Sequence, residues 1–191
     1  MGKGNIFVIS APSGAGKSTL CRYIREHLPE ILYSVSYTTR TPRKGEVDGE
    51  DYFFVSEDEF KLGIEKDRWA EWAFVHGNYY GTSRGYLERS VEKGCNILLE
   101  IDVQGARQIK EKIPESVLIF ILPPSIEELQ KRLVKRATDS QEVIKKRLDA
   151  AAFEMSQCDK FDYSVVNDSF KKACAELLNI FNINMKADKK E

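Results

Sequence analysis

Four short apolar runs stand out along this chain, each bounded by polar or turn-forming residues. They are Ile6–Ile9, Asn96–Asp102, Val117–Leu122 and Tyr163–Asn167. Runs of this length predict strands that are buried on both faces. In Lys17–Leu28 the apolar residues Leu20 and Ile24 are spaced four apart, which predicts a helix that Pro29 ends. Buried strands alternating with helices predict an α/β fold with a central parallel sheet covered by helices.

Two segments interrupt this alternation. Residues 34–87 are polar and aromatic and rich in Gly and Thr, which favours short strands, with antiparallel pairing as one option, and a helix from Glu57. Residues 125–147 begin at a capping box of Ser125 and Glu128, and Asp139 and Ser140 are N-cap candidates for a second helix. We therefore expect one domain, with a core of 1–33, 88–124 and 148–185, an insert of about 34–87, a short helical lid of about 125–147 and a tail of 186–191.

Composition and charge narrow the function classes. The chain has 191 residues, of which 42% are hydrophobic and 31% are charged, a globular composition. Its formal charge of -1 gives no indication of nonspecific binding to nucleic acid or membrane. No apolar run is long enough to predict a leader or a membrane helix. The four cysteines form no CxxC pair, so we expect reduced thiols in a cytoplasmic protein.

The strongest chemical signal is the segment 11–18, which reads Ala-Pro-Ser-Gly-Ala-Gly-Lys-Ser. It matches the phosphate-binding pattern GxxxxGK[ST] except that Ala11 replaces the first Gly, and it lies between a predicted strand and a predicted helix. Gly14 and Gly16 let backbone N–H groups curl around phosphate oxygens. Lys17 would reach the β- and γ-phosphates of ATP, and the Ser18 hydroxyl would meet Mg²⁺. The alternative is a Gly-rich turn that binds nothing.

The expected ATP contacts of this loop are Ser13, Gly14, Ala15, Gly16, Lys17, Ser18 and Thr19. The motif alone does not separate a kinase from a GTPase or an ATPase motor. Asp102 to Gly105 matches the DxxG pattern of GTPases, but the chain has no Asn-Lys-x-Asp sequence to read guanine in their manner. Because Asp102 ends an apolar strand, it is a candidate for a carboxylate that faces Mg²⁺ together with Ser18. A strand-end turn residue is the alternative for Asp102.

Four further segments accompany this loop in a fixed order. They are 34–43 (SVSYTTRTPR), 46–52 (EVDGEDY), 71–82 (EWAFVHGNYYGT) and 99–105 (LEIDVQG). With the loop, they resemble the guanylate kinase family over nearly the whole chain, from about Asn5 to Phe181. The resemblance implies a P-loop fold and phosphoryl transfer from ATP to GMP, giving ADP and GDP, with Mg²⁺ as the cofactor. It implies small-molecule substrates only, ATP and GMP or dGMP, with no nucleic acid, membrane or obligate protein partner.

The resemblance also implies how the acceptor is bound. Arg40 and Arg43 carry planar guanidinium groups suited to phosphate, and Tyr52 and Tyr80 can donate to the same anion. The alternative is that both arginines pair with the acidic run that begins at Glu46.

Guanine presents N1–H and N2–H₂ as adjacent donors, and a carboxylate can accept both hydrogen bonds. The resemblance makes Glu71 this acceptor, with Ser36 and Thr82 as neighbouring hydroxyls, and adds Glu100 and Asp102 as contacts of GMP. From the residues alone, an ordinary surface glutamate is the alternative for Glu71.

Arginines in and after the predicted lid complete the expected site. In the family, Arg136 and Arg147 match arginines that contact the transferring phosphoryl group, so they join Lys17 and Arg43 as catalytic candidates. Arg132 is a further ATP contact, and Asn167 matches a position near the adenine. The alternative for this basic run is a solvated helical face.

Two rival functions stay open. Guanylate-kinase-like domains also occur as catalytically silent peptide-binding modules in scaffold proteins. The retained Gly14, Gly16, Lys17 and lid arginines argue against that class. The other rival is a kinase for UMP or AMP, against which Glu71 argues through the resemblance.

Overall fold

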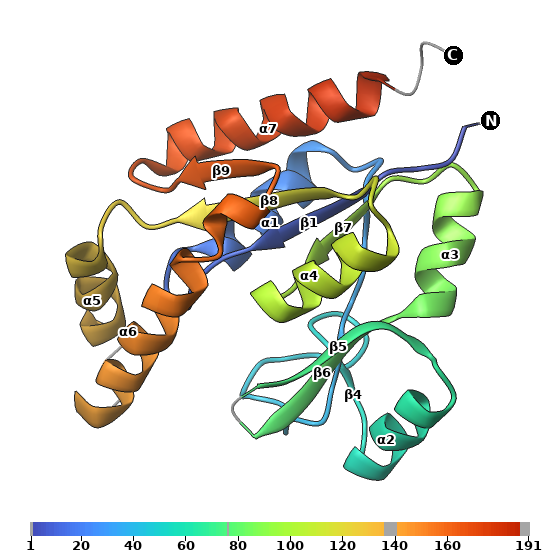
Figure 1. Ribbon diagram of the computed structural model, residues 1–191, viewed down its shortest axis with the longest axis horizontal. Coiled ribbons are helices and arrows are strands. Elements are labelled where there is room, and N and C mark those ends of the chain that lie inside the picture. The colour runs from blue at the N-terminus through green and yellow to red at the C-terminus, as the bar shows by residue number, and fades with distance from the viewer. Residues whose placement is uncertain (1, 76, 136–140, 188–191) are drawn as a thin grey trace.

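A five-stranded parallel sheet forms the centre of the computed structural model, which describes residues 2–75, 77–135 and 141–187 (Figure 1). Its strand order is β2 (Leu32–Tyr33), β7 (Ile97–Glu100), β1 (Ile6–Ser10), β8 (Val117–Leu122) and β9 (Tyr163–Val166). The four predicted strands are confirmed, and together with the flanking helices they confirm the predicted α/β class. Parallel pairing of this kind leaves both faces of the sheet to be covered by helices.

Alternating side chains of β1 pack into two separate hydrophobic cores, one on each face of the sheet. Phe7 and Ile9 point to the face covered by α1 (Lys17–His27) and α7 (Phe170–Ala187), where the ring of Phe7 stacks on Phe181 at a centroid distance of 4.3 Å. Ile6 and Val8 point to the opposite face, covered by α3 (Arg84–Glu92) and α4 (Val103–Lys112). The period of two along a strand thus distributes one apolar run between two helical layers.

A second sheet with the order β4-β3-β6-β5 lies below the first in Figure 1. Its strands are β3 (Tyr37–Thr38), β4 (Phe53–Phe54), β5 (Trp69–Val75) and β6 (Asn78–Ser83). The pairs β3–β6 and β5–β6 are antiparallel, whereas β3 and β4 pair in parallel. Helix α2 (Glu57–Glu65) begins at the predicted residue, and its N-cap Ser56 accepts a hydrogen bond from the Glu59 N–H. The buried ring of Phe60 joins α2 to this sheet by stacking on Trp69 and Tyr79.

Helices α5 (Ile126–Lys135) and α6 (Gln141–Met155) extend from the same side of the central sheet as the second sheet does (Figure 1). The Ser125 hydroxyl accepts from the Glu128 N–H, which confirms the N-terminal end predicted for α5. Leu129 and Leu133 of α5 pack against Ala151 of α6 in a small core of their own. A 3-10 turn, η1 (Cys158–Lys160), follows α6.

Several sequence expectations fall beyond what the structure describes or tests. The proposed N-cap residues Asp139 and Ser140 lie outside the described residues. The division into core, insert, lid and tail stays a prediction. No helix within residues 2–75, 77–135 and 141–187 combines the length and the apolar character that crossing a bilayer requires.

Candidate functional site

A cavity of ≈ 350 Å³ lies where the carboxyl ends of β1 and β7 meet the second sheet. It brings together the loop between β1 and α1, the edge of the second sheet, the end of β7 and one residue of α6. Its lining residues are Ala11, Pro12, Ser13, Gly14, Gly16, Lys17, Ser18, Thr19, Ser36, Tyr52, Glu71, Ala73, Val75, Tyr80, Glu100, Ile101, Asp102 and Glu154. Most of the residues predicted to bind either nucleotide therefore share one cavity.

The loop after β1 adopts a conformation that requires glycine. Gly14 has φ 93° and Gly16 has φ 95°, both in the left-handed region. A Cβ at Gly16 would also lie 2.5 Å from Nδ2 of Asn167, whose side chain donates to the Ala15 carbonyl at 2.7 Å. Asn167 thus holds this loop in place, a contact that the sequence did not predict. Gly16 is the N-cap of α1 and no described side chain caps that helix, so its first N–H groups are available to an anion.

The first residues of α1, directly after this loop, place polar side chains in the cavity. Lys17 Nζ donates to the Ile101 carbonyl at 3.0 Å, and the Ser18 hydroxyl donates to Glu100 Oε1 at 2.6 Å. Asp102 Oδ1 instead accepts from two N–H groups in the first turn of α4, each at 2.8 Å. Asp102 therefore acts as a turn residue at the end of its strand, as the alternative proposed, and it also lines the cavity.

A metal site of Ser18 and Asp102 stays a prediction. Hydroxyl and carboxylate oxygens are ligands that Mg²⁺ accepts, and Ser18, Glu100 and Asp102 all line the same cavity. Within the described ranges, no group of three or more His, Cys, Asp and Glu side chains could hold a metal on its own. The residues present fit an ion that takes the rest of its ligands from phosphate and water.

Glu71 is a buried carboxyl group, with only 3% of its surface exposed. The alternative of an ordinary surface glutamate is therefore wrong. Its Oε1 accepts from the Thr82 hydroxyl at 2.6 Å, across the β5–β6 pair. Burial, with a smaller contribution from the nearby Asp102 charge, raises the pKa of Glu71 to about 7 against the opposing effect of the Thr82 hydrogen bond.

Only some of the residues expected to bind the acceptor phosphate line the cavity. Tyr52 and Tyr80 line the cavity with their ring centroids 6.0 Å apart. Arg40, whose guanidinium carbon lies 5.3 Å from the Tyr52 ring centroid, pairs with Glu46 at 2.8 Å, so the alternative of pairing with the acidic run holds for this arginine. Its Nε is buried and has no acceptor among the described residues. Arg43 is exposed, and its backbone N–H, rather than its side chain, donates to Glu46 at 2.7 Å.

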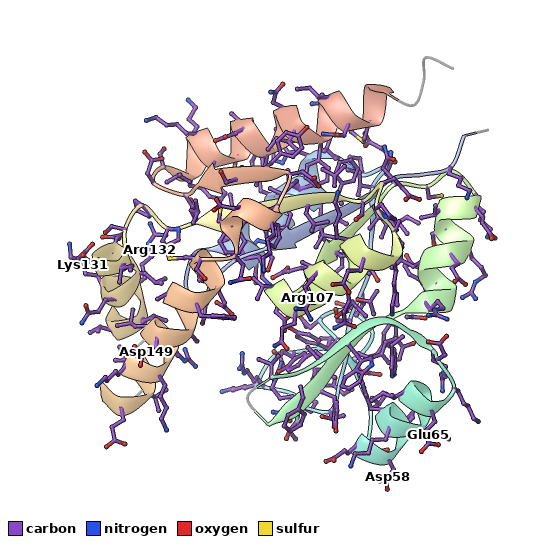
Figure 2. All side chains as sticks on the ribbon, in the orientation of Figure 1. Asp58, Glu65, Arg107, Lys131, Arg132 and Asp149 are labelled. Atoms are coloured by element: carbon purple, nitrogen blue, oxygen red, sulfur yellow. The ribbon has the colours of Figure 1, made fainter. Side chains whose placement is uncertain are left out.

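Two predicted arginines that the structure describes, Arg132 and Arg147, lie outside the cavity lining. Arg132, labelled in Figure 2, donates to the Asn167 carbonyl at 3.2 Å and to Glu128 at 3.4 Å. Arg147 is half-buried on α6, and Arg136 lies outside the described residues.

One residue of α6, Glu154, reaches the cavity without having been predicted. Burial raises the pKa of Glu154, while the charge of Lys17 and the Ser13 backbone N–H act in the opposite direction. No motif marks Glu154 in the sequence, since only the packing of α6 beside the loop brings it there.

Comparison with known proteins identifies relatives of this chain by family model, by sequence and by fold. The family model described as guanylate kinase matches residues 3–184. The guanylate kinase of Geobacter sulfurreducens is 54% identical over 178 residues, which cover 93% of this chain and 88% of that relative. For the guanylate kinase of Geobacter metallireducens the identity is 53% with the same coverage of both chains.

A solved structure agrees. The crystal structure of guanylate kinase from Anaplasma phagocytophilum superposes with a TM-score of 0.79 at 39% identity, covering 97% of this chain and 88% of that chain. Sequence, fold and the cavity with its phosphate-binding loop therefore point to one conclusion. The chain belongs to the guanylate kinase family.

Proposed function

We propose that this protein is an ATP:GMP phosphotransferase that makes ADP and GDP in purine nucleotide metabolism. One observation carries the proposal: the phosphate-binding loop with Lys17 and the buried carboxyl group of Glu71 line the same cavity. A phosphate site and an acceptor suited to guanine are what a kinase for GMP must bring together. The relatives that carry the name guanylate kinase match over most of both chains, which supports the same reaction.

We infer that the guanine base is read by Glu71. Thr82 occupies one carboxylate oxygen of Glu71, and the group lines the cavity, where N1–H and N2–H₂ would donate to it. Ser36 lines the cavity beside it, and Glu100 and Asp102 complete the expected GMP contacts. Adenine offers no adjacent pair of donors, and sites built on hydrogen bonds can reject the wrong partner by roughly 10⁴–10⁵.

The phosphate of GMP would be held by Tyr52 and Tyr80, which line the cavity, and by Arg40 and Arg43. The buried Nε of Arg40 needs an acceptor, which a phosphate oxygen could provide. Arg43, exposed on the same segment, would have to turn toward the cavity when GMP binds. The pairing of Arg40 with Glu46 would orient its guanidinium group for this role.

The triphosphate of ATP would lie in the loop of residues 13–19, against the uncapped N-terminus of α1. Lys17 lines the cavity and would contact the β- and γ-phosphates. Ser18 and Asp102 would hold Mg²⁺, which supplies charge neutralisation on the phosphates when it is bound. Arg132 donates to the Asn167 carbonyl, and the Asn167 side chain donates to the Ala15 carbonyl of this loop. Both residues are proposed to support the binding of ATP.

Catalysis would rest on positioning and electrostatics, since the acceptor phosphate oxygen attacks the γ-phosphorus in line and needs no covalent enzyme intermediate. Lys17, Arg43, Arg136 and Arg147 are the cationic side chains proposed to stabilise the charge in the transition state. Because Arg147 does not line the cavity, its proposed role requires α5 and α6 to approach the second sheet when both nucleotides are bound. Such closure would also exclude water and suppress hydrolysis of ATP.

The test is ADP formation with Mg-ATP and a panel of GMP, dGMP, AMP, UMP and CMP. Turnover confined to GMP and dGMP supports the proposal. Turnover with another monophosphate would overturn the role of Glu71 while keeping the reaction type. Binding of GMP without turnover would favour a catalytically silent binding module.

The free thiols of Cys21, Cys95, Cys158 and Cys174 agree with a reducing compartment, and we propose a cytoplasmic location.

A further inference from the structure

Helix α4 contacts strand β5 through side chains that bond to its backbone. Strand β5 lies at the edge of the second sheet, so one side of it has no neighbouring strand. On that side Gln108 bonds twice to Trp72: its Oε1 accepts from the Trp72 N–H at 3.2 Å, and its Nε2 donates to the Trp72 carbonyl at 2.7 Å. Lys112 Nζ donates to the Ala70 carbonyl at 2.6 Å. A helix thereby satisfies backbone groups that a further strand would otherwise pair.

The residue between these two contacts is Glu71. It lies at an irregularity in the β5–β6 register, which falls between Trp69 and Glu71. Such an irregularity re-aims a side chain but also loosens the local pairing, so an outside support has more effect there. The two backbone contacts from α4 support the strand on either side of Glu71.

A third residue of α4, Gly105, leaves room for the side chain of Glu71. A Cβ at Gly105 would lie 2.3 Å from Glu71 Oε2, so any side chain there would displace the carboxyl group. Gly105, Gln108 and Lys112 follow one another at intervals of three and four residues and so lie on one face of α4. This face touches three consecutive residues of β5, with Glu71 in the middle.

The same helix begins at Asp102, which caps it and lines the cavity. Asp102, an expected contact of GMP, therefore belongs to the helix that contacts Glu71, although Glu71 belongs to the second sheet and Asp102 follows the central one. The first turn of a helix also favours a negative charge, and Glu71 Oε2 lies over that turn.

We propose that Gln108 and Lys112 are positioning residues that hold Glu71 at the base and so determine the preference for guanine. This inference rests on the proposed function and assigns a role to residues outside the cavity lining. Neither side chain would touch GMP. Both act through the backbone of β5, by fixing the distance between Glu71 and the base.

The experiment compares Gln108→Leu and Lys112→Met with the wild-type protein. For each, kcat and KM are measured with GMP, with IMP, which lacks the 2-amino donor, and with varied ATP. Misplacement by about 1 Å can cost on the order of a hundredfold, so we expect KM for GMP to rise about tenfold or more. The preference for GMP over IMP should fall with it, while KM for ATP stays unchanged. Lys112→Arg keeps a donor for the Ala70 carbonyl and should restore most of the preference.

Two controls on the same helix separate positioning from stability. Arg107, labelled on α4 in Figure 2, is exposed and pairs with Glu111, so Arg107→Met should change nothing. Lys110 bonds to Asp162 and does not contact β5, so Lys110→Met should lower the melting temperature and leave base preference intact. If Gln108→Leu and Lys112→Met behave like Lys110→Met, with lower melting temperatures but an unchanged ratio of GMP to IMP, the proposal is wrong.

A readout without substrate keeps this inference separate from the proposed function. The titration of the Glu71 carboxyl group can be followed by carbon-13 NMR, with Glu71→Gln to assign the signal. The Lys112 charge lowers the pKa of Glu71, so Lys112→Met should raise the midpoint. A wild-type protein that does not phosphorylate GMP would refute the proposed function. Gln108→Leu changes no charge, so its midpoint moves only if the surroundings of Glu71 change. An unchanged midpoint in this variant would refute the positioning role, whatever the wild type does.

Discussion

Binding of GMP should release a proton from Glu71 below neutral pH. Burial raises the pKa of this carboxyl group to about 7 in the ligand-free protein. Guanine donors favour the ionised form, because a protonated carboxyl group would turn one acceptor into a donor. The charged groups that act on Glu71 are Asp102, which raises its pKa, and Lys17 and Lys112, which lower it. GMP binding therefore requires the deprotonated state and is linked to pH.

The magnitude follows from this pKa. At pH 6 about nine tenths of the Glu71 carboxyl groups are protonated, and at pH 8 about one tenth. The affinity for GMP should then be about tenfold weaker at pH 6 than at pH 8, a difference of about 1.4 kcal/mol.

The assay is isothermal titration calorimetry of GMP binding in buffers of different ionisation enthalpy, which measures the protons released. The phosphate of GMP titrates near pH 6 as well, so the wild type is also titrated with guanosine, which carries the base without the phosphate. Binding of guanosine should release about 0.9 proton at pH 6 and about 0.1 proton at pH 8. Release of no proton with guanosine at pH 6 would refute the reasoning, since it would mean that Glu71 is already ionised or does not meet the base.

Stability gives an independent check on the same group. The pKa of Glu71 is raised above its unfolded value, so folding favours the protonated form. Its effect on the free energy of unfolding is most favourable below about pH 4.5 and is lost as the pH rises through about 7. The loss is on the order of 3 kcal/mol. Glu71→Gln, which removes the charge, should raise the melting temperature at pH 8 and leave it nearly unchanged at pH 4.5. A variant that melts no higher than wild type at pH 8 would contradict this account.

Three further substitutions test the core, the loop and the lid. Phe181→Ala removes a buried ring stacked on Phe7 and should cost about 3–5 kcal/mol in chemical denaturation; a cost below 1 kcal/mol would contradict the packing. Gly16→Ala adds strain of about 1–2 kcal/mol at φ 95° and a Cβ against Asn167, so KM for ATP should rise steeply in steady-state assays, and an unchanged KM would exclude the loop as the ATP site. Arg147→Ala should lower kcat by about 10³ with KM for GMP nearly unchanged, and the reverse outcome would move this arginine to GMP binding.

Much of the fold and one part of the site were determined by local sequence. The apolar runs predicted the strands because a buried parallel strand needs apolar side chains on both faces, and β8 matches its predicted run residue for residue. The phosphate-binding loop was equally local, since Gly14 and Gly16 adopt backbone angles that other residues rarely reach. Such features depend on neighbours in the chain, so a single sequence contains them.

The environment of Glu71, the proposed acceptor for guanine, depended on tertiary structure. Nothing around Glu71 in the sequence shows that it is buried, because that burial comes from β6 and from α4, more than thirty residues further along the chain. The same holds for Glu154, which enters the cavity only through the packing of α6. The hydrogen bonds of Gln108 to Trp72 also join β5, an edge strand of the second sheet, to α4, which covers the central sheet. Contacts between distant segments are set by how sheets and helices pack. The sequence therefore predicted candidate groups, whereas only the fold shows their burial, their distances and their supports.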